Sequence, residues 1–355
     1  MNHSALVRAV AIAAFSLCLC VAVLGAYVRL SNAGLGCPDW PGCYGHLTPS
    51  GAAADTRTAT APLAGRPLDL GKAWREMLHR YAAGTLGCLI LGLAAMGIKW
   101  RSERIVPPWF AMALLAIVLV QGMLGMLTVT WQLTPLIVSL HLLFGFTTLS
   151  LLWWLVLTLW LQHAGPRAAG AGAAAAALHS SAGGLIAARR LALLALVAVG
   201  LQIALGGWTS SNYAAIACPE LPTCQGSWWP QADFRSAFVL WGGLGIDYEG
   251  GVLASPARVA IQLSHRFGAV VASLALLAAA LAALRVRAPR PAAAAAAVLL
   301  LALALQLVIG VSMVLRGFPL WLATAHNAGA ALLLLATLAL NRSLRPTSAP
   351  EAHAG

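Results

Sequence analysis

Long apolar segments, separated by polar connections, run along most of the chain. Each is close to the roughly 20 residues that an α-helix needs to cross the hydrocarbon core of a membrane. A membrane-spanning backbone must satisfy its own hydrogen bonds, so apolar segments of this length predict helices rather than open strands. The predicted membrane helices cover residues 9–29, 76–98, 107–129, 136–161, 190–209, 257–283, 292–315 and 320–341.

The composition supports this interpretation, because 60% of the 355 residues are hydrophobic and only 9% are charged, whereas a soluble domain carries about 25% charged residues. We therefore expect an all-α integral membrane protein with eight transmembrane helices. The first apolar segment lies where a signal peptide would, but no small-residue cleavage site follows it cleanly. Its end also recurs at the end of the fifth predicted helix, so we expect it to be retained as a membrane helix.

The net charge of +12 comes from Lys and Arg residues that lie mainly in the short connections. Aromatic residues do not interleave with them as they do on surfaces that bind nucleic acid, so we expect no nucleic-acid partner. Cytoplasmic connections of membrane proteins are enriched in Lys and Arg. With a cytoplasmic N-terminus, the inside segments hold twelve of these residues and the outside segments seven, which predicts that both termini are cytoplasmic.

An internal repeat divides the chain into two halves. The motif CPDWPGC at 37–43 returns as CPELPTC at 218–224, at an offset of 181, and HRY at 79–81 returns as HRF at 265–267, at an offset of 186. Steady offsets over separate features in the same order predict two tandem, pseudo-symmetric four-helix bundles with parallel topology. The predicted parts are an N-terminal half at 1–165, a cytoplasmic Ala/Gly-rich linker at 166–188, a C-terminal half at 189–345 and a disordered tail at 346–355.

Four histidines, His79, His141, His265 and His326, lie near the outer start of the second and fourth predicted helix of each half. An ionisable group inside a membrane helix is costly and is usually functional. Two imidazoles that face each other across a helical bundle can supply both axial ligands of a heme iron. A buried histidine bonded to a neighbouring hydroxyl or carbonyl is the simpler alternative, and zinc fits less well because it usually takes three or four protein ligands. The repeated placement favours heme ligation by one histidine pair in each half.

An arginine follows the first histidine of each half, at Arg80 and Arg266. Such a side chain can extend to the membrane surface, or its guanidinium can bind a heme propionate in a bidentate manner. The sequence leaves both interpretations open.

Three residues before the same histidines, the two halves differ: the first has Glu76 and the second has Gln262. This spacing puts each residue on the same helix face as its histidine. A carboxylate beside a heme pocket can accept protons or stabilise positive charge, which an amide cannot do. We therefore expect chemistry in the N-terminal half and a permanent cofactor in the C-terminal half. The alternative is that Glu76 only pairs with a neighbouring arginine at the membrane surface.

Each long outer loop carries two cysteines separated by five residues, two of which are proline. Disulfides persist outside the cytoplasm, and the Cys-x-x-Cys spacing typical of redox enzymes is absent. This favours two disulfides within the loops, Cys37–Cys43 and Cys218–Cys224, over catalytic thiols, although a redox role for the first pair stays open.

Six segments carry a family resemblance: GAYVRLSNAGLGCPDWPGCYG (25–45), EMLHRYAAGTLG (76–87), QGMLG (121–125), GGWTSSNYAAIACPELPTC (206–224), LSHRFGA (263–269) and TAHNAGA (324–330). Together they closely resemble the heme A synthase family over nearly the whole chain. The resemblance implies an eight-helix oxidoreductase that oxidises the C8 methyl group of heme O to the formyl group of heme A, for cytochrome oxidase assembly.

The resemblance also implies a role for each matched residue. His265 and His326 would ligate a resident heme b, while His79 and His141 would hold the substrate heme iron, with Glu76 as an essential acidic residue. It implies heme O as substrate, heme O synthase and cytochrome oxidase assembly factors as partners, and a place in the bacterial inner membrane. It leaves a homo-oligomer open.

Three other functions fit parts of the same pattern. A diheme b-type electron-transfer protein that oxidises quinol would hold both hemes permanently. A heme-delivery protein would return heme O unchanged. A thiol–disulfide oxidoreductase would depend on the loop cysteines and not on the histidines.

Overall fold

The computed structural model describes residues 2–55, 66–163, 182–286 and 290–345, and its regular structure in these ranges is helical apart from two isolated β-bridges. Within them, eight helices are long and apolar enough to cross a membrane, which confirms the predicted fold class and each predicted span. These helices are α1 (His3–Leu30), α4 (Leu70–Lys99), α5 (Pro108–Thr130), α6 (Pro135–His163), α8 (Ala182–Ser211), α10 (Ser255–Arg285), α11 (Arg290–Leu315) and α12 (Leu320–Ser343).

Several helices begin earlier than the hydrophobic pattern predicts. The helix α4 starts at Leu70 rather than at residue 76, because the side chain of Asp69 caps it by accepting a hydrogen bond from the Lys72 N–H at 3.0 Å. The helix α8 starts at Ala182, although the sequence predicted a linker up to residue 188. The rest of that linker and the predicted tail at 346–355 lie outside the described residues.

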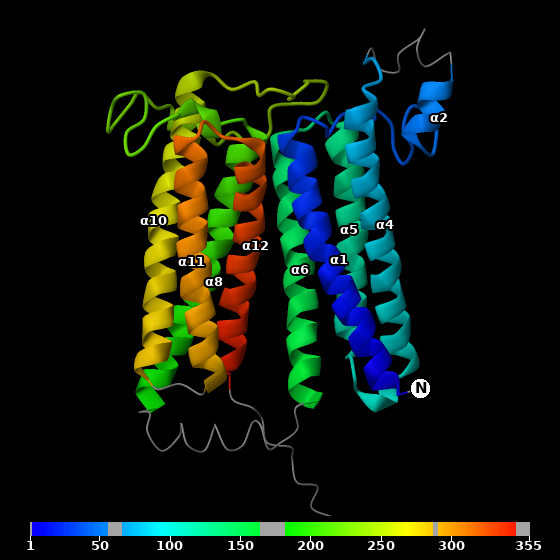
Figure 1. The fold of residues 1–355 in the computed structure, drawn as a ribbon, viewed down its shortest axis with the longest axis vertical. Coiled ribbons are helices and arrows are strands. Elements are labelled where there is room, and N and C mark those ends of the chain that lie inside the picture. The colour runs from blue at the N-terminus through cyan, green and yellow to red at the C-terminus, as the bar shows by residue number, and fades with distance from the viewer. Residues whose placement is uncertain (1, 56–65, 164–181, 287–289, 346–355) are drawn as a thin grey trace, which may run out of the picture.

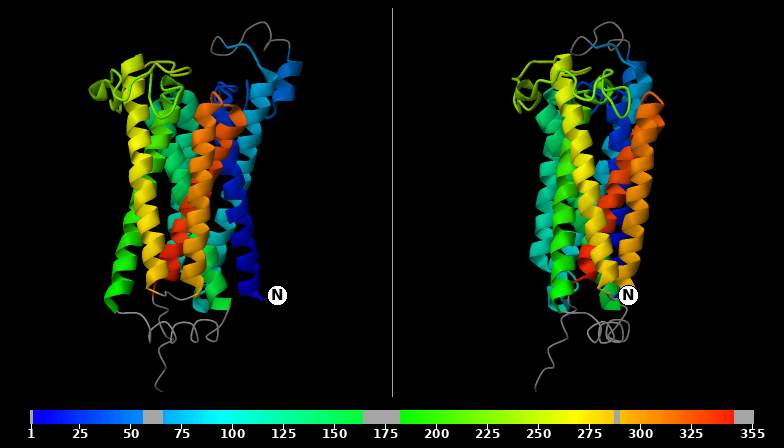
Figure 2. Two further views of the ribbon diagram at one scale, coloured as in Figure 1. Left: turned by 60° about the vertical axis from the view of Figure 1, so that its left-hand side comes forward. Right: turned by 90° about the vertical axis from the view of Figure 1, so that its left-hand side faces the viewer.

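The two long connections gather at one end of the bundle, as Figures 1 and 2 show. They follow α1 and α8, at residues 31–69 and 212–254. The start of α1 and the end of α12 both lie at the opposite end (Figure 1), as expected for an even number of crossings. The short helices in the long connections are α2 (Pro49–Ala54), η3 (Ala215–Ala217) and α9 (Phe234–Ala237), and η2 (Arg101–Glu103) lies at the opposite end.

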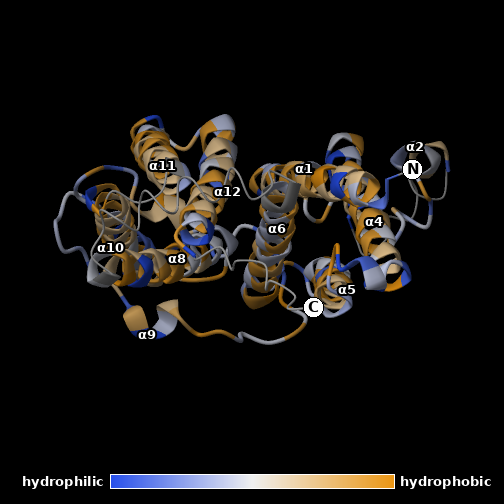
Figure 3. Cartoon of the chain, turned by 90° about the horizontal axis from the view of Figure 1, so that it is seen from below, coloured by the Kyte–Doolittle hydropathy of each residue, from blue (hydrophilic) through white to orange (hydrophobic). Residues whose placement is uncertain are grey.

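The long helices form two rings of four. In the first ring α1 contacts α4, α4 contacts α5, α5 contacts α6, and α6 contacts α1. In the second ring α8, α10, α11 and α12 contact one another in the same order. The rings meet where α1 contacts α12 and where α6 contacts both α8 and α12, and Figure 3 shows them side by side. The first ring is formed by helices from residues 3–163 and the second by helices from residues 182–343.

The main hydrophobic core lies at the end of the bundle away from the long connections. Its buried residues are rich in alanine, including Ala11, Ala188, Ala279 and Ala292 with 0% exposure. Small side chains let membrane helices approach closely and gain van der Waals contact. At the end with the long connections, the buried clusters are smaller and surround the two cysteine pairs. The tight packing at one end leaves room at the other, where the four histidines lie.

Candidate functional site

Each of the four histidine rings packs against a glycine on a neighbouring helix. The partner of His79 on α4 is Gly25 on α1, where an added Cβ atom would lie 2.8 Å from the ring carbon Cε1. No side chain fits in that space, so the ring depends on glycine for its position. The other three pairs behave alike, with Cβ-to-Cε1 distances of 3.2 Å for Gly125 and His141, 3.3 Å for Gly206 and His265, and 3.0 Å for Gly310 and His326.

The histidine pair of the C-terminal half faces across the second ring of helices. The ring centroids of His265 and His326 are 6.5 Å apart, and the ring planes make an angle of 78°. Two imidazoles that bind one metal ion from opposite sides, with bonds of about 2 Å, place their centroids roughly 6 Å apart. The spacing therefore fits a heme iron held between these two side chains.

The histidine pair of the N-terminal half borders a large cavity. This cavity of about 1100 Å³ lies mainly between α1, α4, α5 and α6, and its lining is mostly apolar. His79, His141, Glu76 and Arg80 supply polar groups to it. The Nδ1 atoms of both histidines are buried and have no hydrogen-bond partner within the described part of the chain. Two imidazoles on the wall of a mostly apolar cavity offer ring nitrogens that can bind the metal ion of a ligand held there.

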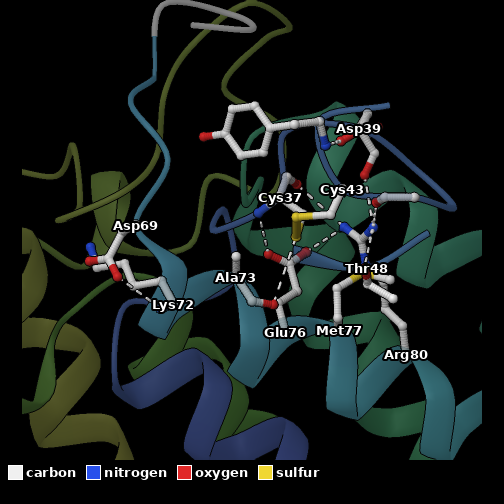
Figure 4. Close-up of a disulfide and its surroundings, with 12 residues drawn as sticks. Cys37, Asp39, Cys43, Thr48, Asp69, Lys72, Ala73, Glu76, Met77 and Arg80 are labelled. Carbon is white, nitrogen blue, oxygen red and sulfur yellow. Dashed lines mark hydrogen bonds and ion pairs between the residues drawn. A yellow bond between two sulfur atoms is a disulfide. The ribbon is translucent and has the colours of Figure 1, made fainter. Parts of the chain in front are cut away.

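Glu76 lines the cavity. Its carboxylate lies beside the Cys37–Cys43 disulfide, as Figure 4 shows. Its side chain is buried, at 4% exposure. One oxygen accepts a hydrogen bond from the Cys37 N–H at 2.8 Å, and the other pairs with the Arg80 guanidinium. Gln262 is equally buried in the other half, where its amide oxygen has no partner among the described residues. The difference predicted between the halves is thus a difference between two buried side chains at the same kind of position.

The two arginines hold the disulfide loops, a role that neither of the interpretations from sequence included. Arg80 donates hydrogen bonds to the carbonyl groups of Asp39, at 2.8 Å, and of Cys37, at 3.3 Å (Figure 4). Arg266 does the same in the second loop, to the carbonyl groups of Glu220, at 2.7 Å, and of Cys218, at 3.0 Å. A guanidinium with several donors in a fixed plane suits such a cluster of carbonyl oxygens.

Both loops are closed by a disulfide, Cys37–Cys43 and Cys218–Cys224, with a Cα–Cα distance of 4.7 Å in each. Asp39, the acidic residue of the motif CPDWPGC, stabilises the first of these loops as well. The carboxylate of Asp39 accepts hydrogen bonds from the backbone N–H groups of Tyr44, at 2.6 Å, and Gly45, at 2.8 Å. A buried or half-buried loop with its polar groups satisfied in this way forms a rigid cover beside the cavity.

Arg29 was not predicted as a site residue, although it lies within the segment GAYVRLSN at 25–32. Arg29 lines the cavity, donates to the carbonyl of Ser210 at 2.8 Å and stacks on the ring of Tyr213 at 4.2 Å. Its buried Nε atom has no partner among the described residues. The guanidinium therefore joins the two halves and keeps one donor unpaired among the described residues.

Sequence reasoning also missed the glutamines that pack beside the histidines. In the sequence they are visible as the pattern Gln-x-x-x-Gly, in which the glycine is the one that packs against a histidine ring. The pattern occurs at 121–125, 202–206 and 306–310.

Histidine pairs held between membrane helices are characteristic of proteins that bind heme within the membrane, and the fold and the histidine geometry place the chain in this class. Comparison with known families is more specific. Residues 8–338 match the COX15-CtaA family, described as cytochrome oxidase assembly protein, and the chain belongs to this family.

The curated relatives agree with one another. The chain is 40% identical over 323 residues to the heme A synthase of Shewanella oneidensis. The aligned residues cover 91% of this chain and 92% of that protein. It is 28% identical over 335 residues to heme A synthase 2 of Acidiphilium cryptum, covering 89% and 85% of the two chains. A heme A synthase of Shouchella clausii is 27% identical over 265 residues, covering 73% and 70%.

Proposed function

We propose that this membrane protein is an oxidoreductase that converts heme O to heme A by oxidising the C8 methyl group to a formyl group. The observation that carries the proposal is the large apolar cavity bordered by two histidines and by a buried carboxylate. Relatives that span most of the chain and are named heme A synthase support the same activity.

We assign the substrate to the N-terminal half. A cavity of about 1100 Å³ lies above the roughly 300–1,000 Å³ of most small-ligand sites, which suits a porphyrin that carries a long apolar tail. His79 and His141 would orient the substrate through its iron. The apolar lining excludes water and strengthens the electrostatic effect of the few polar groups in the cavity.

Glu76 would be the catalytic carboxylate of this site. Oxidation of a methyl group to a formyl group removes electrons and protons in steps, and a carboxylate can accept those protons or stabilise a developing positive charge. The Cys37 N–H and the Arg80 guanidinium fix its two oxygens, so its orientation is set before the substrate binds.

We assign a resident heme b to the C-terminal half, with His265 and His326 as its axial ligands. The centroid separation of 6.5 Å supports this assignment. When bound, heme b supplies a redox centre that can exchange single electrons with the neighbouring site. The Nε atom of Arg266 is buried without a partner among the described residues, which leaves a donor for a heme propionate, and we assign Arg80 the equivalent role toward the substrate heme.

We further propose that the two rings are pseudo-symmetric halves with different tasks, and that the protein spans the bacterial inner membrane with both termini in the cytoplasm. The equal order of helix contacts in the two rings supports the first point. The distribution of Lys and Arg supports the second. Heme O synthase and cytochrome oxidase assembly factors are the expected partners, and self-association into a homo-oligomer is compatible with this arrangement.

The test is to express the chain in cells that make heme O, extract the hemes and identify them by mass. We expect heme A together with protoheme. A folded protein that carries two permanent hemes and returns heme O unchanged would refute the proposal and would favour a diheme electron-transfer protein.

A further inference from the structure

Three of the four histidines have a glutamine beside them on the neighbouring helix, and the fourth does not. The glutamines lie four residues before the glycine that packs against the histidine ring, at Gln121 on α5, Gln202 on α8 and Gln306 on α11. At the matching place before Gly25 on α1, the residue is Val21. The pattern therefore has a single exception, and the exception faces His79.

Each glutamine donates a hydrogen bond to the backbone carbonyl of its histidine, and two of the three also lie near the ring. The amide nitrogen of Gln121 donates to the backbone carbonyl of His141 at 2.9 Å. That of Gln202 donates to the carbonyl of His265 at 3.0 Å and also lies 3.0 Å from the ring atom Nδ1. A carbonyl group so engaged fixes the backbone of the ligand residue as well as its ring.

The same contacts recur in the second helix pair of the C-terminal half. The amide nitrogen of Gln306 donates to the carbonyl of His326 at 3.1 Å and lies 3.3 Å from Nδ1. Both Gln202 and Gln306 are seated against a glycine that follows the histidine. An added Cβ atom would lie 2.3 Å from the Gln202 oxygen at Gly268 and 2.1 Å from the Gln306 oxygen at Gly329.

The exception extends to this second glycine. At the offset of 186 that relates the two HR motifs, Gly268 corresponds to Ala82. After His141 this position holds Phe144, and Gln121 lies beside the next residue, Gly145, where an added Cβ atom would be 3.1 Å from its amide nitrogen. Around His79, neither the glutamine nor a glycine at this position is present.

We propose that Gln121, Gln202 and Gln306 are positioning residues that hold the heme-ligating histidines, and that Val21 leaves His79 without such a side-chain partner. The proposal rests on the heme sites proposed above. Both ligands of the resident site then have a glutamine partner, whereas in the substrate site only His141 has one, which suits a heme that is bound and released repeatedly.

The chemistry of an imidazole ligand supports this role. When a metal ion binds Nε2, the ring proton is on Nδ1 and needs an acceptor, and such outer partners fix the ring and tune its basicity. The amide oxygens of the three glutamines are buried without a partner among the described residues. For Gln202 and Gln306, whose amide nitrogens lie 3.0 Å and 3.3 Å from Nδ1, a turn of the terminal amide group would present this oxygen to Nδ1 in exchange for the hydrogen bond to the histidine carbonyl.

The test measures heme retention, not turnover. The full-length protein is loaded with ferric protoheme at both sites, and heme loss to excess apomyoglobin is followed by absorbance. We expect a fast and a slow phase, with the fast phase absent in His79→Ala. Because loss of an outer partner typically weakens metal binding 10–100-fold, Gln202→Leu and Gln306→Leu should speed the slow phase by about 10-fold. The control Gln225→Leu removes a loop hydrogen bond to Ala217 and should change neither phase.

Electron paramagnetic resonance of the ferric protein gives a second readout, because the angle between the two imidazole planes determines the g values. We expect Gln202→Leu to shift the signal of the resident heme as the ring turns away from its angle of 78° to the other ring. An unchanged slow phase together with an unchanged signal in both glutamine variants would overturn the proposal.

A variant that adds the missing contact keeps the proposal testable if the leucine variants do not fold. Val21→Gln combined with Ala82→Gly should slow the fast phase by about 10-fold, and an unchanged fast phase would overturn the proposal. These outcomes are separate from the proposed activity. A wild-type protein that makes no heme A would refute the activity, while altered retention in the variants would still support the glutamine assignment.

Discussion

Replacing Glu76 with glutamine tests the difference between the two halves. The change removes one negative charge and keeps the shape of a side chain that is 4% exposed. An amide oxygen can still accept the hydrogen bond from the Cys37 N–H, but the ion pair with Arg80 is lost. Glutamine is also the residue that the C-terminal half has at the same position, Gln262, so the fold already accommodates it once.

The expected effects on stability and on turnover differ widely. Breaking a buried ion pair can cost about 3–5 kcal/mol, but Arg80 keeps its hydrogen bonds to the carbonyl groups of Cys37 and Asp39. We therefore expect the free energy of unfolding to fall by about 1–3 kcal/mol, the cost of one group left partly unsatisfied. Loss of a positioned acid or base lowers turnover by about 10²–10⁴-fold.

The assay compares heme A formed per molecule of folded protein with the absorbance spectrum of the resident heme. We expect Glu76→Gln to lose nearly all heme A and to keep the resident spectrum. The control Glu103→Gln makes the same charge change at the opposite end of the bundle, where the Glu103 side chain bonds His3, and should keep full activity. Normal heme A formation in Glu76→Gln would refute the assignment of chemistry to this carboxylate.

Three further changes test the first disulfide loop, the glycines that pack against the histidine rings, and the ion pairs between the two long loops. Replacing Cys37 and Cys43 with serine opens a loop closed over a sequence separation of 6, which should lower the free energy of unfolding by about 2 kcal/mol and lower Tm in detergent; an unchanged Tm would contradict this. Gly25→Leu should exclude the substrate heme and keep the resident heme, and Gly206→Leu should do the reverse, because each glycine packs against one histidine ring. Equal heme contents in the two variants would contradict the assignment. Arg66→Ala breaks partly exposed ion pairs to the second long loop, so we expect the free energy of unfolding to fall by less than about 1 kcal/mol, a loss that disappears at high salt. A larger loss that does not depend on salt would contradict this.

The spans and the ligand candidates could be predicted from sequence because each has a strong physical requirement. A membrane helix needs an apolar segment of fixed minimum length, and a histidine in such a segment is costly unless it has a task. The ends of the helices were less predictable, since polar caps such as Asp69 extend α4 beyond its apolar part.

The contacts between elements could not be predicted in the same way. The hydrogen bonds of Arg80 and Arg266 to the loop carbonyls depend on the path of an irregular loop, which has no periodicity to read. The pairing of each glutamine with a histidine depends on how two helices are rotated toward each other, although the repeated spacing of Gln202 and Gly206 was visible in the sequence. Likewise, nothing in the sequence placed Tyr248 of the second long loop on Gln132 of the first half, where its N–H donates at 3.1 Å.

The two halves are proposed to bind heme for different purposes, and a structure of the protein isolated from cells that make heme O tests this difference most directly. We expect heme b between His265 and His326, and heme O or its oxidised products in the cavity beside His79, His141 and Glu76. Heme O between His265 and His326, or the same heme species at both sites, would contradict it.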